Sequence, residues 1–185
     1  FLMWTVVGSI NYLDITSAAH AGAIATGTAT ALVVLFLVAA TGNSVAGAII
    51  EVRRTLNGGT SWQTAASALP TLYPTDVAFD PRHGAQVWLS YSGYGNPHVY
   101  KSSDAGLTWT DQSGNLPDIP TQCVVVDPAD SNAVYVGTDL GVYETFDGGA
   151  TWAPSSAGMP TAMITDLVIE PTARRMRAAT FGNGV

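Results

Sequence analysis

Hydrophobic residues in this chain come in short runs separated by turn residues, and the runs recur in a fixed order. The first kind of run ends in an acid followed by proline, and it occurs at 77–81, 124–128 and 167–171. A second kind follows at 87–93, 134–138 and 176–180, and a third at 99–102 and 142–145. The runs are rich in Val, Tyr, Thr and Phe, which is typical of β-strands. Proline cannot donate a hydrogen bond within a sheet, so we expect it to end each first strand.

A turn-rich phrase that ends in tryptophan follows both third runs and also occurs once before them. It occupies 55–62, 102–109 and 145–152, and so recurs at intervals of roughly 45 residues. Four short antiparallel strands in a period of this length make one blade of a β-propeller. A parallel β-helix is the competing repeat fold, although its coil is usually shorter than this period. The pattern therefore predicts an all-β fold, a β-propeller of four-stranded antiparallel blades, of which this chain holds about three to four.

The phrase itself has the composition of a tight turn. A short Asp side chain can accept N–H bonds from the backbone two residues further on, and the amide oxygen of an Asn can do the same. Glycine supplies the positive φ that such a turn needs. The tryptophan can fill the gap between neighbouring blades, with its indole N–H donating to a backbone carbonyl. We therefore predict a structural role for Asn57, Gly59, Trp62, Asp104, Gly106, Trp109, Asp147, Gly149 and Trp152.

These residues carry a family resemblance. The pattern Ser/Thr-x-Asp-x-Gly-x-Thr-Trp resembles the Asp-box, or bacterial neuraminidase (BNR) repeat, of sialidases, xyloglucanase-type glycoside hydrolases, sortilin-type receptors and photosystem II assembly factor propellers. The resemblance covers roughly residues 50 to 185. It implies that each box is a structural turn between the third and fourth strands of a blade, away from the ligand face. The acids are also one blade apart, which is too dispersed for a paired-carboxylate catalytic site.

The first fifty residues differ from the rest. No charged residue occurs between positions 21 and 50, and 31–40 is the most apolar run of the chain. A transmembrane helix needs about 20 apolar residues, and no basic segment precedes this run as in a signal peptide. We therefore predict a divergent apolar blade region at 1–50, with an insertion within 27–50, followed by one continuous repeat domain at 51–185.

The amino-acid composition limits the classes of partner and indicates the cellular compartment of the protein. The net charge is −7 with only 7 basic residues, which argues against nucleic acid and against an anionic membrane surface. Low charge with many Thr, Ser, Gly and Ala residues is typical of an exported protein, so we expect an extracellular or periplasmic location. The single Cys123 is predicted to be a small buried hydrophobic residue rather than a catalytic thiol.

No residue of the chain has the pattern of a catalytic or metal-binding group. The three histidines lack metal-ligand spacing, so neither a metal nor another cofactor is predicted. Three arginines at 174, 175 and 177 are adjacent in sequence, whereas those of sialidases come from different blades. Xyloglucanase-type enzymes carry an acid in an Arg-Thr-Asp stretch, and this chain has Leu56 at that place. The densest aromatic group surrounds the loop 92–97. We expect Trp88, Tyr91, Tyr94, His98 and Tyr100 to form either a contact surface or simple packing between strands.

The sequence thus predicts a non-enzymatic, secreted binding or scaffold module of an Asp-box propeller that contacts a polysaccharide or a protein. Two alternatives stay open. The chain could be a fragment of a sialidase-like or xyloglucanase-like glycoside hydrolase whose catalytic acids lie outside it. It could also be a self-assembling surface protein, joined through open blade edges, because an unclosed array exposes unpaired strands.

Overall fold

A computed structural model describes residues 36–37, 52–57, 60–66, 69–72, 74–155 and 157–182 of the chain. All strands in these ranges pair antiparallel in four sheets, and the same ranges contain no helix. No helix in the described part of the chain is therefore long and apolar enough to cross a membrane. The prediction of an all-β fold is confirmed.

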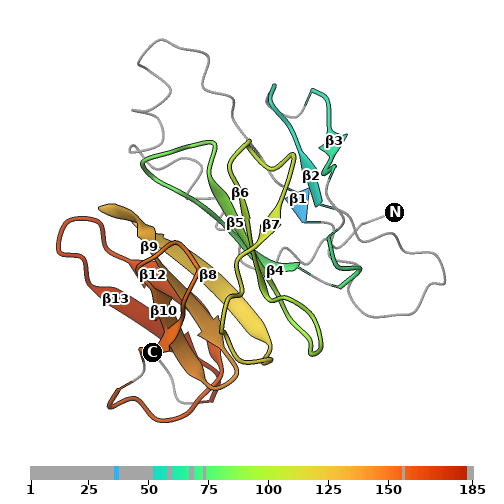
Figure 1. Ribbon diagram of the computed structural model, residues 1–185. Helices are drawn as coiled ribbons and strands as arrows, with labels where there is room; N and C mark the ends of the chain where they lie inside the picture. Colours follow the sequence, from blue (N-terminus) through green and yellow to red (C-terminus); the bar gives the residue numbers. More distant parts are fainter. Residues whose placement is uncertain are drawn as a thin grey trace, which may run out of the picture.

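The strands of each sheet follow one another in sequence order (Figure 1). The first sheet consists of β1 (Phe36–Leu37), β2 (Val52–Arg54) and β3 (Gln63–Thr64). The second consists of β4 (Pro74–Phe79), β5 (Val87–Tyr91), β6 (Val99–Ser102) and β7 (Thr110–Asp111). The third consists of β8 (Thr121–Asp127), β9 (Asp130–Thr138), β10 (Gly141–Thr145) and β11 (Ala153–Pro154). The fourth consists of β12 (Ile164–Ile169) and β13 (Met176–Thr180).

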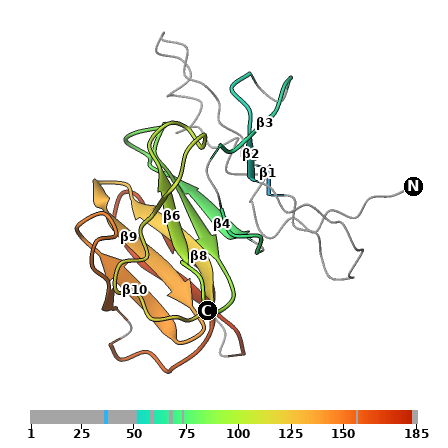
Figure 2. The ribbon, with the colours of Figure 1, turned by 45° about the vertical axis from the view of Figure 1, so that its right-hand side comes forward.

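This arrangement is part of a β-propeller, as the repeat predicts. The second and third sheets are complete four-stranded blades, and the first and fourth sheets hold three and two described strands. In both ribbon views the sheets succeed one another from β1–β3, through β4–β7, to the sheet of β8–β10 (Figures 1 and 2). Of the predicted divergent region 1–50, only residues 36–37 are described, as strand β1. The predicted insertion within 27–50 otherwise lies outside the described residues.

The first strands of neighbouring blades run side by side in the same direction. Near their starts, the hydroxyl of Thr75 donates to the carbonyl of Thr121 at 2.7 Å. Just beyond their ends, Nδ1 of His83 lies 2.9 Å from the hydroxyl of Ser131. Equivalent loops of successive blades therefore lie on the same face. We call the face formed by the loops between second and third strands the hairpin face. The opposite face is formed by the loops between first and second strands and by the turns at 102–109 and 145–152, which we call box turns, and we call it the box face.

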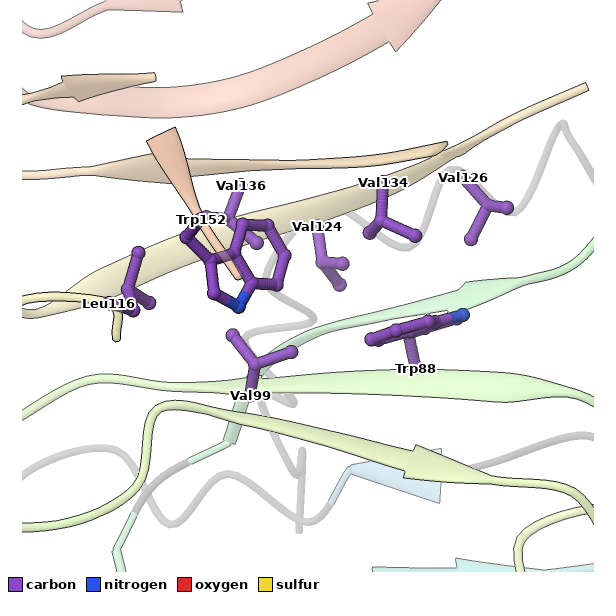
Figure 3. Close-up of a cluster of buried hydrophobic side chains, with 8 residues drawn as sticks. All are labelled: Trp88, Val99, Leu116, Val124, Val126, Val134, Val136 and Trp152. Carbon is purple, nitrogen blue, oxygen red and sulfur yellow. The ribbon is translucent and has the colours of Figure 1, made fainter. Parts of the chain in front are cut away.

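The main apolar core lies between the second and third sheets. Figure 3 shows its side chains pointing toward one another from the two sheets, with Trp152 between them. The cluster consists of Trp88, Val99, Leu116, Val124, Val126, Val134, Val136 and Trp152. The indole N–H of Trp152 donates to the carbonyl of Gln112 at 2.9 Å, so the buried polar end of the ring is satisfied. One tryptophan thus closes the gap between two blades.

Similar clusters fill the other two gaps. Trp109 packs with Val52 of the first sheet and with Leu89 and Tyr91 of the second. Between the third and fourth sheets the cluster is smaller and contains Cys123, Val142, Ile164 and Leu167. Strand β5 is buried at all of its positions because both of its faces meet another sheet, as in fully covered strands generally. Each blade is therefore stabilised mainly by its neighbours.

Gly137 marks the tightest contact between the third and fourth sheets. A Cβ atom at this position would lie 2.5 Å from Sγ of Cys123 and 2.7 Å from Cγ2 of Ile164. We expect Gly137→Ala to lower the free energy of unfolding by about 1–3 kcal/mol, because overpacking a dense core forces side chains off their rotamers. Urea unfolding followed by tryptophan fluorescence measures the change.

Gly84→Ala is the matched control. A Cβ atom there would have no neighbour within 4 Å, so its effect should stay within about 0.5 kcal/mol. Equal stability of the two variants would contradict the close packing of the third and fourth sheets.

Candidate functional site

The second box turn is closed by its own side chains. Oδ1 of Asp104 accepts the backbone N–H of Thr108 at 2.8 Å, and its Oδ2 accepts the hydroxyl of the same residue at 2.6 Å. The hydroxyl of Ser102 donates to Asp104 at 2.9 Å and accepts the N–H of Gly106 at 2.8 Å. Gly106 has a φ of 83°, which only glycine adopts readily. The acid therefore has its hydrogen-bonding capacity occupied within the turn.

The third box repeats this arrangement. Asp147 accepts the N–H of Thr151 at 2.9 Å and its hydroxyl at 2.6 Å, and the hydroxyl of Thr145 at 2.7 Å. Gly149, with a φ of 94°, donates its N–H to the hydroxyl of Thr145 at 3.0 Å. The same set of bonds thus recurs one blade further on.

The first box shows how an amide replaces the acid. Oδ1 of Asn57 accepts the N–H of Ser61 at 2.9 Å, as the carboxylates do in the other boxes. Its Nδ2 instead donates to the hydroxyl of Ser61 at 2.8 Å, so one hydrogen bond has the opposite polarity. The hydroxyl can adopt either role by rotating. Gly59, the glycine predicted for this box, lies outside the described residues.

The tryptophans of the boxes differ in burial. Trp109 and Trp152 are 7% and 4% exposed, whereas Trp62 is half-buried. The indole N–H of Trp109 donates to the carbonyl of Gly106 at 3.1 Å, within its own turn.

Both box acids are held ionised at neutral pH. Burial acts to raise the pKa of Asp104, but hydrogen bonds from Thr108, Ser102 and Leu107 outweigh it and lower the pKa to about 2. Hydrogen bonds from Thr151 and Thr145 likewise lower the pKa of Asp147 to about 2. A carboxylate with such a pKa is a poor general acid or base near pH 7. The geometry of the boxes thus suits a structural turn better than chemistry.

The box face is crowded with polar groups that bind one another. The box turns contact the loops between first and second strands, as when the N–H of Ala105 donates to the carbonyl of Ala85 at 2.9 Å. The guanidinium of Arg174 pairs with Asp127 at 2.6 Å, and that of Arg54 donates to the carbonyl of Asp104 at 2.6 Å. Arg174 is therefore engaged on this face, and its neighbours Arg175 and Arg177 are exposed on the same strand pair.

The hairpin face carries an exposed apolar side chain at the tip of each of the second, third and fourth blades. Tyr94, Leu140 and Phe181 are 66%, 53% and 73% exposed. Each is followed by a glycine of positive φ, at positions 95, 141 and 182. The turn therefore projects the large side chain outward while the glycine reverses the backbone. We call these three residues the apolar tips.

One segment between the second and third blades fixes two of the tips. The carboxylate of Asp118 accepts the N–H of Gly95 at 2.7 and 2.9 Å and lies 3.1 Å from Nε2 of His98. Two residues later, the carbonyl of Pro120 accepts the N–H of Asp139 at 3.1 Å. The side chain of Asp139 in turn accepts the amide of Gln122 at 2.9 Å. Tyr94 and Leu140 are thus held on neighbouring tips by a common connection.

The structure corrects the predicted aromatic contact surface. Four of its five members are buried, with exposures of 0 to 8%, namely Trp88, Tyr91, His98 and Tyr100. Trp88 belongs to the core between the second and third sheets, and the ring of Tyr91 packs edge-on against Tyr100 at 5.6 Å. Only Tyr94 reaches the surface. The prediction grouped these residues because they are close in sequence. Side chains alternate between the two faces of a strand, and neighbouring sheets cover both faces of this blade, so most of the group is buried.

Sequence reasoning missed Leu140 and Phe181. The signal was present as a large apolar residue followed by glycine just after each second strand, as in Leu140-Gly141. Such a pair is too short to be informative before the strands have been aligned with one another.

Asp76 lies near the start of β4 and joins the first strands of two blades. Its Oδ1 accepts the N–H of Val77 at 2.8 Å, and its Oδ2 accepts that of Val124, on β8, at 3.0 Å. Burial, together with a smaller effect of the charge of Asp166, raises the pKa of Asp76 to about 6, although these two N–H bonds lower it. The carboxyl group is therefore a buried link between blades whose charge changes in mildly acidic solution.

Cys123 is buried, as predicted, and burial raises the pKa of its thiol, with smaller contributions from Asp76 and Asp166. A thiol in this environment is unreactive. Within the described ranges, no group of three or more His, Cys, Asp or Glu side chains is arranged to hold a metal ion.

No protein-family model matches the chain, and no curated protein matches it. Solved structures do match. "YCF48 bound to D1 peptide" is 19% identical with a TM-score of 0.52, over 72% of this chain and 43% of that one. The GH74 xyloglucanase from Xanthomonas campestris is 18% identical with a TM-score of 0.52, over 72% of this chain and 27% of that one. An ancestral GH74 enzyme is 21% identical with a TM-score of 0.53, over 72% of this chain and 20% of that one.

These similar structures are β-propellers, which agrees with the arrangement of the sheets. At such identities the likeness shows the fold alone. This chain spans less than half the length of each of the three structures.

The lowered pKa values of Asp104 and Asp147 predict that the protein loses stability in acid. Their pKa values are lower in the folded chain than the ordinary 3.8, so the unfolded chain binds more protons between about pH 4 and pH 2. The stability that they contribute is present above pH 4 and is lost as the pH falls through 2. We expect the double variant Asp104→Asn/Asp147→Asn to lose less stability than the unmodified chain over this range, as measured by urea unfolding at several pH values. Asn57→Asp should have the opposite effect, and equal acid sensitivity of all three chains would contradict the role of the box acids.

The raised pKa of Asp76 predicts that stability depends on pH in the opposite sense at higher pH. Its pKa is raised in the folded chain from 3.8 to about 6, so the folded chain binds the extra proton between these values. Stability should therefore fall as the pH rises from 4 to 7, by at most roughly 3 kcal/mol. Asp76→Asn should remove this slope whatever its effect on absolute stability, and Asp166→Asn should shift the slope to lower pH. An unchanged slope in Asp76→Asn would show that another group is responsible.

Proposed function

We propose that this chain is part of a non-enzymatic Asp-box β-propeller that binds another protein through its hairpin face. The observation that carries the proposal is the row of apolar tips, one on each of three successive blades. Large apolar side chains that water surrounds on an otherwise well-packed protein are typical of interaction sites when they gather on one face. Tyr94 and Leu140 belong to blades with a neighbour on each side, so their exposure is not the result of an open edge.

The rigidity of the tips supports a binding role. Asp118 and the carbonyl of Pro120 hold the backbone of two tips through direct hydrogen bonds. A preorganised surface loses less conformational entropy on binding than mobile loops do. The box turns on the other face and the tryptophans in the core between blades stabilise the array, which leaves the hairpin face free for a partner.

A protein partner suits the tips better than a polysaccharide. Leu140 has no flat ring on which a sugar could stack, although the aromatic residues Tyr94 and Phe181 have one. The similar propeller structure "YCF48 bound to D1 peptide" is of a protein that binds a peptide, so the fold supports this kind of interaction. The xyloglucanases have the same kind of fold, and the likeness therefore does not decide between binding and hydrolysis.

The low share of charged residues, 11%, supports an extracellular or periplasmic location for the module. The glycoside hydrolase alternative depends on acids outside this chain, and self-assembly depends on the unpaired blade edges. Both stay predictions from the sequence.

Replacement of the apolar tips tests the proposal. The probe is a neutral, fluorescently labelled peptide of three Leu-Ser-Gln repeats, and binding to the full chain is followed by fluorescence anisotropy. We expect the triple variant Tyr94→Ser/Leu140→Ser/Phe181→Ser to bind about tenfold more weakly or not at all, because exposed apolar side chains supply most of the contact energy.

The control changes exposed apolar residues of the box face instead. Leu56 and Phe146 are 47% and 61% exposed, and the variant Leu56→Ser/Phe146→Ser should bind the peptide as the unmodified chain does. Circular dichroism checks that both variants are folded. Equal losses in the two variants, or binding of a xyloglucan oligosaccharide and not of the peptide, would contradict a protein-binding hairpin face.

A further inference from the structure

The basic residues of the chain all lie on one side of the blades. Each is in a loop between first and second strands, or within two residues of such a loop or of a box turn. They are Arg53, Arg54, Arg82, Lys101, Arg174, Arg175 and Arg177. All seven are thus at the box face or close to it, and none is on a loop of the hairpin face.

Several of these cations are tied to that side by hydrogen bonds. Arg54 donates to the carbonyl of Asp104 at 2.6 Å, and Arg174 pairs with Asp127 at 2.6 Å. Arg82 donates to the carbonyl of Ala129 in the next blade. These side chains therefore cannot swing across a blade to neutralise acids on the opposite face.

The hairpin face, in contrast, carries acids among the apolar tips. The side chain of Asp118 is 58% exposed although it binds the tip of Tyr94, and Asp139 directly precedes Leu140 and is half-buried. Asp166 is exposed near the start of β12, on the same half of the blades. Asp118 and Asp139 are thus fixed beside apolar tips, with no Lys or Arg on the surrounding loops, and the ring of His98 lies 3.1 Å from Asp118.

A partner that covers the apolar tips must also cover these carboxylates. Removing a carboxylate from water is costly unless a positive charge or hydrogen-bond donors replace the water. An acidic partner would add repulsion between like charges, which discriminates strongly at interfaces. The partner therefore needs large apolar groups and cations at close spacing.

We propose that the hairpin face binds a peptide segment in which Lys or Arg residues alternate with large apolar residues. The inference rests on the proposed function and adds the chemical class of the partner. The apolar residues contact Tyr94, Leu140 and Phe181, and the cations contact Asp118 and Asp139.

Three labelled peptides of equal length test this inference on the full chain. They consist of three repeats of Leu-Ser-Lys, Leu-Ser-Gln and Leu-Ser-Glu, and their affinities are measured by fluorescence anisotropy in low salt and in about 0.5 M salt. The Lys peptide should bind most tightly and the Glu peptide most weakly. The difference should shrink in high salt because exposed charges are screened.

Two matched variants locate the effect. Asp118→Asn/Asp139→Asn should weaken binding of the Lys peptide about threefold to tenfold more than binding of the Gln peptide, because a looser Tyr94 tip affects both peptides whereas the lost charges affect only the Lys peptide. Asp104→Asn/Asp147→Asn changes the net charge equally but on the box face, where Asn57 shows that an amide fits the turn. This control should keep the preference for the Lys peptide, which separates a local effect from the net charge of −7.

The outcomes separate the two proposals. Equal affinities for the three peptides that are lost in the apolar-tip variant would overturn the charge preference and leave the proposed function standing. Equal effects of the two Asn double variants would also overturn it, because the attraction would then come from net charge alone. No binding of any peptide, or binding that the apolar-tip variant retains, would contradict the proposed function itself.

Discussion

The structure depends on burial of apolar surface between successive blades. A four-stranded sheet of this kind has apolar residues on both faces, and strand β5 is buried at every position only because sheets cover it on either side. Trp109 and Trp152 fill two of the gaps, and Gly137 allows the third to close. Because each blade lacks a core of its own, the blades stabilise one another as neighbouring repeats do in other repeat proteins.

The two faces of the array have different physical characters. On the box face, carboxylates, hydroxyl groups and guanidinium groups bind one another or the backbone, so that Asp104 and Asp147 stay ionised and engaged. On the hairpin face, the loops are tied through their backbone at Asp118 and Pro120, and their large side chains point outward. A face whose polar groups are already bonded contributes stability, whereas a face with fixed, unbonded apolar side chains is suited to a partner.

Much of the fold could be predicted from the sequence, and less of the candidate site. The strands, their order and the box turns follow from periodic signals that occur three times, so that each unit supports the interpretation of the others. The aromatic group around Tyr94 occurs once and had no such support. Its members alternate along β5 and β6, and whether an aromatic side chain is buried there depends on which sheets cover the blade.

The sequence by itself determined the local turns and the repeat, because these depend on residues a few positions apart: an Asp or Asn, a glycine of positive φ and a hydroxyl group. Only the tertiary structure decided which side chains reach the surface. It buried Trp88 between two sheets, linked Asp76 to the next blade and aligned Tyr94, Leu140 and Phe181 on one face. The physical reason is that burial, pKa and the shape of a surface depend on residues that are far apart in sequence and meet only when the blades pack together.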